Sequence, residues 1–143
     1  MIRINEKGLT FIELVISLAV ISIIASVALP LTKVVVKRTK EMELRRNLRE
    51  IRQAIDKYKE NYDKGLYGPK ILGISGYPKT LDVLVSKKIL RSIPEDPMID
   101  STDWGTCSYS DPAESLFSNK MDVYNVYTKN EEKAIDGTKY RKW

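Results

Sequence analysis

An apolar segment near the amino terminus constrains this chain more than any other feature. From Leu9 to Leu29 one residue in 21 is charged, and Pro30 follows directly. At 1.5 Å rise per residue an α-helix over this segment is roughly 31 Å long, which matches the hydrocarbon core of a bilayer. Because the backbone must satisfy its own hydrogen bonds in lipid, we expect a helix that can span a membrane.

Glu13 is the charged residue within this segment. An unpaired carboxylate in hydrocarbon is costly, so an ionisable residue at this depth predicts a function and a partner. The alternative interpretation is that Glu13 lies close enough to one end of the span to reach headgroups and water.

Residues 7–13, Lys-Gly-Leu-Thr-Phe-Ile-Glu, followed by the apolar run, resemble the prepilin signature of the type IV pilin-like family. That signature is a basic leader ending in glycine, a hydrophobic first mature residue and a glutamate as the fifth mature residue. Counted from Leu9, Glu13 is the fifth residue and Pro30 the twenty-second. The family usually has phenylalanine in the first position, where this chain has Leu9.

This resemblance implies a processing pathway and an assembly mechanism. A prepilin peptidase would cleave after Gly8 and methylate the new amine of Leu9. Glu13 would pair with the amino-terminal amine of a neighbouring subunit as the helices bundle into a filament, since opposite charges attract strongly in a medium of low dielectric. Pro30 would kink the helix, because it lacks an N–H donor and its ring crowds the preceding turn.

Other interpretations of the apolar segment remain open. A secretory signal peptide would be cleaved at a small-x-small site, for which Ser26-Val27-Ala28 is the candidate. A plain membrane anchor needs no cleavage at all. The positive-inside rule opposes a translocated carboxyl side, because four basic residues follow the span and two precede it: Lys33, Lys37, Arg38 and Lys40 against Arg3 and Lys7.

The rest of the chain predicts a long helix followed by a small domain. Apolar residues at spacings of three and four form one stripe on the amphipathic continuation of the helix, namely Leu44, Leu48, Ile51, Ile55, Tyr58 and Tyr62. We expect Glu41–Arg45 and Glu60–Lys64 to form i,i+4 ion pairs, and Gly65 to end the helix. The expected divisions are a leader over 1–8, a transmembrane and filament-core helix over 9–29, its continuation over 30–64 and a globular α+β region over 65–143.

Within this globular region the pattern predicts short elements. Residues 65–80 are a glycine- and proline-rich loop, Thr80 caps a short helix over 81–90, and 93–97 form a rigid turn. Strands are expected over 105–110 and 122–129, the second with Val123 on the opposite face from Val126. The predicted fold is therefore α+β and pilin-like, with the long helix covering a short antiparallel sheet.

The order of these pieces resembles the major pseudopilin of type II secretion systems. The matching features include Tyr77-Pro78, the Pro94-x-Asp96-Pro97 turn and Trp104-Gly105. That group often binds calcium near the carboxyl end, where this chain offers Asn130, Glu131, Glu132 and Asp136 without an aspartate-dense pattern. We expect no cofactor, and keep these four residues as candidates for a calcium site. A second acidic group, Asp96, Asp100 and Asp103, is typical of turn and capping chemistry.

Composition argues against an enzyme. The chain has no histidine and one cysteine, Cys107, which excludes Ser-His-Asp and Cys-His pairs, HExxH zinc sites and an internal disulfide. The net charge of +5 comes largely from a basic run over 33–52. We interpret this run as a solvated helix face, and a membrane-tethered nucleic-acid-binding protein is the alternative that it leaves open.

The resemblance therefore implies a structural subunit of a type II secretion pseudopilus that drives protein export across the outer membrane. The implied partners are further copies of the chain, prepilin peptidase, the inner-membrane assembly platform and minor pseudopilins. The implied location is the bacterial inner membrane, single pass, with a periplasmic carboxyl-terminal domain. A type IV pilin for adhesion, motility or DNA uptake is the alternative within the same class.

Overall fold

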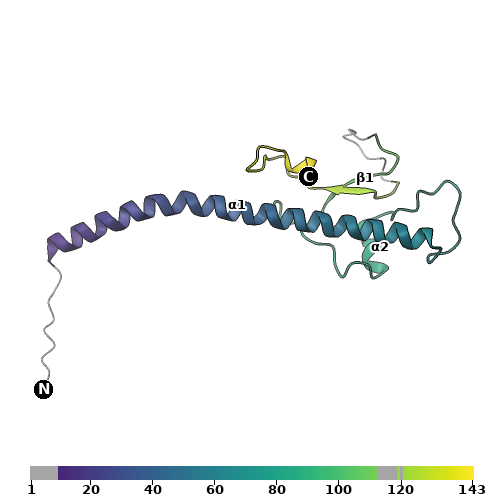
Figure 1. The fold of residues 1–143 in the computed structure, drawn as a ribbon, viewed down its shortest axis with the longest axis horizontal. Helices are drawn as coiled ribbons and strands as arrows, with labels where there is room; N and C mark the ends of the chain where they lie inside the picture. The colour runs from purple at the N-terminus through teal and green to yellow at the C-terminus, as the bar shows by residue number, and fades with distance from the viewer. Residues whose placement is uncertain (1–9, 113–118, 120) are drawn as a thin grey trace, which may run out of the picture. The chain divides into compact units, whose positions relative to one another are not determined.

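The computed structural model describes residues 10–112, 119 and 121–143, and of residues 27–31 the backbone only. Its elements are helix α1 (Phe11–Asp63), helix α2 (Leu81–Ser86), strands β1 (Gly105–Cys107) and β2 (Asn125–Tyr127), and the 3₁₀-helix η1 (Tyr140–Lys142) (Figure 1). A long amino-terminal helix followed by a small region with a two-stranded antiparallel sheet confirms the predicted α+β, pilin-like fold.

The chain divides into two compact units, residues 1–37 and residues 38–143. The described part of the first unit consists almost entirely of the first half of α1. Every side chain from Phe11 to Ser26 is exposed. Ser17 and Ser22 donate their hydroxyl protons to main-chain oxygens one turn earlier, at 2.7 and 2.8 Å, so neither hydroxyl needs an outside partner.

Among the residues that the structure describes, no helix combines the length and the apolarity required to cross a membrane.

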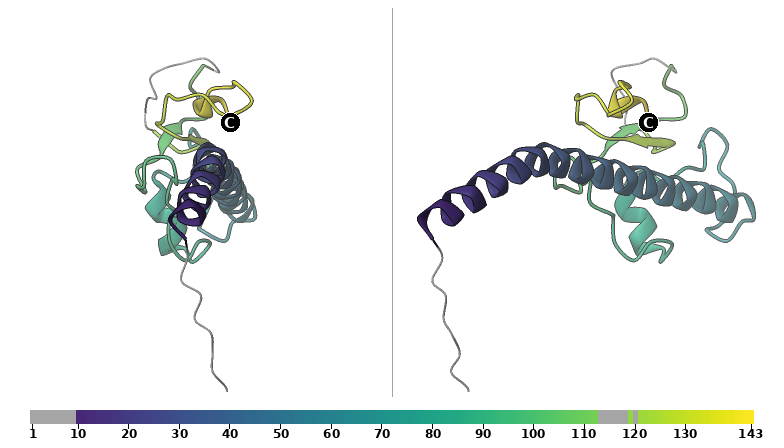
Figure 2. Two further views of the ribbon diagram at one scale, coloured as in Figure 1. Left: turned by 90° about the vertical axis from the view of Figure 1, so that its left-hand side faces the viewer. Right: turned by 60° about the vertical axis from the view of Figure 1, so that its left-hand side comes forward.

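The second unit is built around the other half of α1. Leu44, Leu48, Ile51 and Ile55 are buried, which confirms the predicted stripe at these four positions, whereas Tyr58 and Tyr62 are half-buried. Seen along the helix in Figure 2, α2 and the yellow carboxyl-terminal segment lie on different sides of α1. The core is completed by residues from these two sides and from the sheet region, chiefly Leu81, Leu84, Val123, Val126 and Tyr140.

The predicted short elements are longer than the observed ones, although the starts at Leu81 and Gly105 are confirmed. The helix predicted over 81–90 ends at Ser86, and Lys88 has a positive φ of 57°, which takes the chain out of helical geometry. The strands have three residues each, with Thr106 paired to Val126. The predicted end of the first strand and both predicted ends of the second were wrong, because hydrogen bonds to loops, rather than propensity, decide where the ladder stops.

Val123 shows this effect directly. The alternation predicted that Val123 and Val126 face opposite sides of the strand, but both side chains are buried. Val123 lies before β2, and its N–H donates to the carbonyl oxygen of Pro78 at 2.7 Å. A loop contact thus sets the direction of this side chain, whereas the pleat sets that of Val126.

The predicted Glu41–Arg45 ion pair is wrong. The Glu41 Oε1 atom accepts hydrogen bonds from the Tyr140 hydroxyl and the Ile135 N–H, both at 2.8 Å. Arg45 instead faces Asp136 at 3.3 Å and lies 3.8 Å above the Trp143 ring. Tertiary partners therefore override the local i,i+4 preference at both positions. The Glu60–Lys64 pair is confirmed, and with Lys57 it lowers the pKa of Glu60 to about 2.

The turn over 93–97 is fastened to α1. The buried Asn47 side chain donates to the Glu95 carbonyl oxygen at 2.8 Å, and the Trp104 indole donates to the Pro94 carbonyl oxygen at 2.8 Å. Asp96 is buried and its Oδ1 atom accepts the Met98 N–H at 2.8 Å, as expected of turn chemistry. The other two acids of that group form ion pairs instead: Asp100 with Lys40 and Asp103 with Lys129.

Candidate assembly site at the start of the helix

Thr10 and Glu13 define the start of α1. The Thr10 hydroxyl oxygen accepts the Glu13 N–H at 3.4 Å, and the Thr10 carbonyl oxygen accepts the Leu14 N–H at 3.1 Å. The spacing Thr-x-x-Glu is that of a capping box, in which a threonine satisfies a free N–H of the first turn. This capping contact was not among the features predicted from the sequence. The Thr-x-x-Glu spacing places the Glu13 carboxylate in the first turn, where the helix dipole favours negative charge.

The surroundings of Glu13 leave its carboxylate available. Its neighbours Phe11, Ile12 and Leu14 are exposed apolar residues. Within residues 10–112, 119 and 121–143, Glu13 forms no ion pair, and its side chain forms no hydrogen bond. If lipid or other apolar helices cover this surface, the carboxylate needs a cation from elsewhere, because an unpaired charge in a medium of low dielectric is strongly unfavourable.

The other predicted residues of this site are only partly described. Gly8 and Leu9, the predicted cleavage and methylation positions, lie outside the described residues. At Pro30 the backbone is helical and belongs to α1. The kink at Pro30 stays a prediction.

Comparison with known proteins bears directly on this segment. Residues 3–29 match the family model described as the prokaryotic N-terminal methylation motif. No curated protein and no solved structure matches the chain. The motif covers Gly8, Leu9 and Glu13, and it supports a type IV pilin-like subunit that is processed as a prepilin, anchored at a membrane and assembled into a filament.

Two of the four calcium candidates, Asn130 and Asp136, accept hydrogen bonds from residues two positions further along the chain. The Asn130 side-chain oxygen accepts the Glu132 N–H at 2.7 Å, and Asp136 Oδ1 accepts the N–H and hydroxyl of Thr138 at 2.8 and 2.6 Å. These Thr138 contacts, with a smaller contribution from Arg45, lower the pKa of Asp136. Across the described residues no group of three or more acidic or cysteine side chains is placed to hold a metal ion.

Two arginines of the basic run, Arg45 and Arg52, are bound to distant parts of the chain. Arg52 donates to the Asn125 side chain at 2.8 Å and to the carbonyl oxygens of Val126 and Trp143 at 3.0 and 2.7 Å, and burial lowers its pKa. Arg45 is held by Asp136 and Trp143. Replacing these two arginines would damage the fold, so a test of nucleic-acid binding should be confined to Arg46 and Arg49. Loss of a steeply salt-dependent affinity in that double variant would support the binding interpretation.

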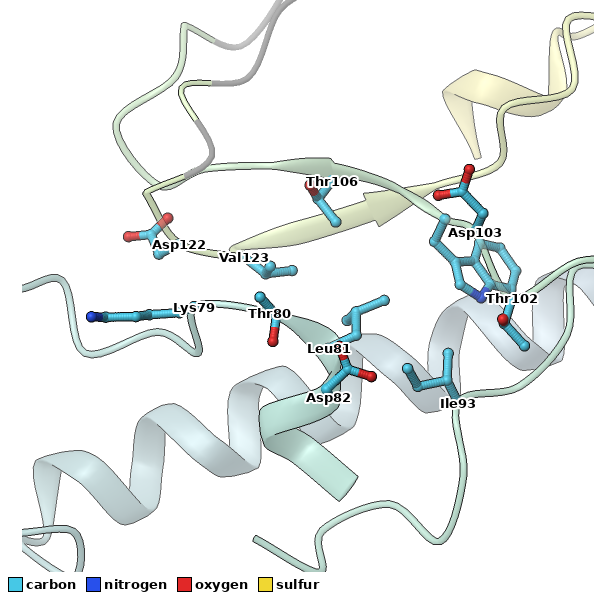
Figure 3. Close-up of a pocket in the computed structure, with 11 residues that line it drawn as sticks. Lys79, Thr80, Leu81, Asp82, Ile93, Thr102, Asp103, Thr106, Asp122 and Val123 are labelled. Atoms are coloured by element: carbon cyan, nitrogen blue, oxygen red, sulfur yellow. The ribbon is translucent and has the colours of Figure 1, made fainter. Parts of the chain in front are cut away.

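A pocket of about 410 Å³ lies between α2 and the sheet region, with Leu81 and Val123 on its two sides (Figure 3). Its carboxylates include Asp122, whose oxygens accept hydrogen bonds from Ser108, Ser75 and the Tyr109 N–H. Burial alone would raise the pKa of Asp122, but these three donors outweigh it and the pKa lies below its usual value. Asp103, the acid near Trp104, is paired with Lys129 at 2.6 Å.

The lining of this pocket combines carboxylate, lysine, threonine and apolar side chains. The complete set of lining residues is Lys79, Thr80, Leu81, Asp82, Ile93, Thr102, Asp103, Trp104, Thr106, Asp122 and Val123. None of these described residues is a histidine or cysteine. Cys107 is half-buried on β1, and burial raises the pKa of its thiol, which disfavours the thiolate that a nucleophile requires.

Proposed function

We propose that this chain is a structural subunit of a type II secretion pseudopilus. It is inserted in the bacterial inner membrane through residues 9–29 with its carboxyl-terminal domain in the periplasm. It is cleaved after Gly8, methylated at Leu9 and assembled through α1. The observation that carries the proposal is an exposed apolar half-helix with Glu13 in its first turn, inside a matched methylation motif.

The exposed apolar half-helix supports assembly because it needs a cover. From Phe11 to Ser26 none of its side chains is buried by the chain itself. An apolar surface of this extent is typical of a membrane-contacting or protein-contacting region. Lipid supplies the cover before assembly, and the same helices of neighbouring copies supply it afterwards.

Glu13 sets the axial offset between the α1 helices of neighbouring copies in the filament. When a copy is added, the Leu9 amine of one copy meets the Glu13 carboxylate of the next, and both charges lose their contact with water. Removing one partner from such a buried pair costs about 3–5 kcal/mol, because it leaves the other charge uncompensated. The pair therefore favours one axial offset between copies over the apolar alternatives.

Cys107 favours the secretion variant over a surface pilin. Many type IV pilins have two cysteines that clamp a carboxyl-terminal loop, whereas this chain has a single cysteine. In the secretion variant the filament is short and periplasmic, and it pushes folded proteins through an outer-membrane channel. Its partners are prepilin peptidase, the inner-membrane assembly platform and minor pseudopilins.

The test compares two glutamates of α1 in cells that contain a complete secretion apparatus lacking its own major subunit. Glu13→Ala should still be cleaved after Gly8 but should give no filaments and no export. Glu43→Ala, an exposed glutamate 3.9 Å from Arg46 in the second half of α1, is the matched control and should assemble normally. Normal filaments from Glu13→Ala would contradict the charge-pairing mechanism. Filaments that form without restoring export would favour the type IV pilin alternative.

A further inference from the structure

The carboxyl-terminal segment, residues 130–143, doubles back on itself beside α1, and Figure 2 draws it in yellow. The Ala134 N–H donates to the Thr138 carbonyl oxygen at 2.8 Å, and Gly137, with a positive φ of 85°, lies in the turn between them. The Tyr140 side chain is fully buried and anchors the segment in the core. We refer to residues 130–143 as the carboxyl-terminal loop.

A closed ring of contacts joins this loop to the guanidinium of Arg45 on α1. Arg45 lies 3.3 Å from the Asp136 Oδ2 atom, while Asp136 Oδ1 accepts the N–H and hydroxyl of Thr138. The Thr138 hydroxyl oxygen accepts the Trp143 indole N–H at 2.7 Å, and the centre of the Trp143 ring lies 3.8 Å from Arg45. A carboxylate and an aromatic face are both favourable surroundings for a cation.

Glu41 lies one turn before Arg45 on α1 and holds a second part of the loop. Its Oε1 atom accepts the Ile135 N–H and the Tyr140 hydroxyl, both at 2.8 Å. The Tyr140 ring in turn meets the Trp143 ring edge to face, with centroids 5.0 Å apart. Two charged side chains of the helix therefore set the conformation of the carboxyl-terminal loop.

These contacts do not leave a donor set that fits the calcium ion implied by the resemblance. Both oxygens of Asp136 are engaged, one by Thr138 and the other by Arg45, and the Asn130 side-chain oxygen accepts the Glu132 N–H. Calcium takes about six to eight oxygen ligands, and a guanidinium already beside the loop repels a further cation. In the part of the chain that the structure describes, no three acidic side chains converge.

We propose that Arg45 is the cation that closes the carboxyl-terminal loop on α1, in place of a calcium ion. The loop then takes its conformation from the helix without a divalent metal and stays closed when divalent metals are removed. This closure is a property of the single chain, so it does not depend on the proposed function. Within the proposed function, assembly and export should not depend on calcium.

Thermal unfolding of the unmodified full chain in mild detergent tests the requirement for metal. Calcium chloride and EDTA should each shift the midpoint temperature by less than about 1 °C, because neither binds the folded loop. A calcium site at about a hundredfold excess of calcium over its Kd would raise the midpoint by about 10 °C. Magnesium chloride at the same concentration controls for ionic strength. A larger rise that calcium alone produces and EDTA reverses would overturn the proposal.

Hydrogen exchange measured by mass spectrometry tests the role of Arg45. In Arg45→Gln the amides of the carboxyl-terminal loop should exchange about tenfold faster, because the carboxylate contact and the stacking on Trp143 are lost. The amides of α1 around Ile51 should keep their wild-type rates. Arg46→Gln is the matched control, since Arg46 is exposed and lies 3.9 Å from Glu43, and it should leave the loop unchanged. Unchanged exchange of the loop in Arg45→Gln would contradict the proposal.

A conservative variant separates charge from bulk. Arg45→Lys keeps the positive charge beside Asp136 and should recover part of the protection that Arg45→Gln loses. No recovery would mean that Arg45 does not act as a cation. The calcium measurement uses the unmodified chain, so it decides the metal requirement even where a variant fails to fold.

Failure of the two proposals can be told apart. A chain that forms no filaments in the complete apparatus, but whose loop ignores calcium and opens in Arg45→Gln, would contradict the proposed function and support closure by Arg45. Normal filaments from a chain that calcium stabilises would do the reverse.

Discussion

The two halves of α1 place their apolar residues in different surroundings. From residue 11 to 26 every side chain is exposed, whereas Leu44, Leu48, Ile51 and Ile55 are buried under the chain's own domain. The difference lies in the pattern. The first half is apolar on all sides, which suits a surrounding of lipid or other helices, and the second half confines its apolar residues to one stripe.

Polar contacts follow the same division. In the second half, Glu41, Asn47 and Arg52 each bond to segments far along the chain, between 48 and 99 residues away. In the first half the serine hydroxyls bond within the helix. Over residues 11–26 the structure shows no tertiary hydrogen bond or ion pair that would break when this segment exchanges one surrounding for another, whereas the second half holds the domain in place.

The largest expected effect contrasts two isoleucines of this one helix. Ile51→Ala should lower the free energy of unfolding of the second unit by about 2–5 kcal/mol, because it opens a cavity in the core. Ile21→Ala, at an exposed position, should change it by less than about 0.5 kcal/mol. Urea unfolding of the full chain in mild detergent, followed by tryptophan fluorescence, measures both values. Equal losses would contradict the division of α1 into two kinds of surface.

A smaller effect is expected at Gly105, where the β1 backbone lies close to the Tyr127 ring on β2. A Cβ atom on Gly105 would lie 2.3 Å from the Tyr127 ring, its partner across the strands. Gly105→Ala should therefore destabilise the second unit by about 1–3 kcal/mol through overpacking. Adding Tyr127→Leu should recover part of this loss in the same unfolding assay. If the stability losses of the two substitutions were fully additive, contact with the Tyr127 ring would not be the cause of the loss in Gly105→Ala.

The smallest expected effect is a change in the pH dependence of stability when Asp122 is replaced. Its folded-state pKa is lowered, so its contribution to stability is present above the unfolded pKa of about 3.9 and is lost as the pH falls through the folded value. Asp122→Asn should flatten the decline in stability below about pH 4. The exposed Asp82→Asn serves as control and should keep the wild-type slope. An unchanged slope in Asp122→Asn would mean that Ser75 and Ser108 do not stabilise the carboxylate.

Periodicity predicted what depends on the helix alone. The stripe over 44–55 and the stop at Gly65, which has a positive φ of 74°, follow from spacing and backbone preference. The length of the strands, the partner of Glu41 and the direction of Val123 depend on contacts between distant segments, and no local pattern encodes them.

The candidate assembly site could be predicted from a different kind of signal. Glu13 stood out because a carboxylate is unexpected in an apolar run, and the motif supplied the chemistry of Gly8 and Leu9. The capping role of Thr10 was encoded locally, three residues before Glu13, and could have been predicted from that spacing. The predicted partner of Glu13, the amine of a neighbouring copy, stays a prediction, because it belongs to another molecule in the proposed filament.

The most direct test of the proposed function is the intact mass and amino-terminal sequence of the chain purified from membranes, with and without a prepilin peptidase. The proposed function predicts a chain that starts at N-methylated Leu9 when the peptidase is present and at Met1 when it is absent. A chain that keeps Met1 in both cases would be a plain anchor, and one that starts at Leu29 would be a secreted domain. Either result would contradict the proposed function.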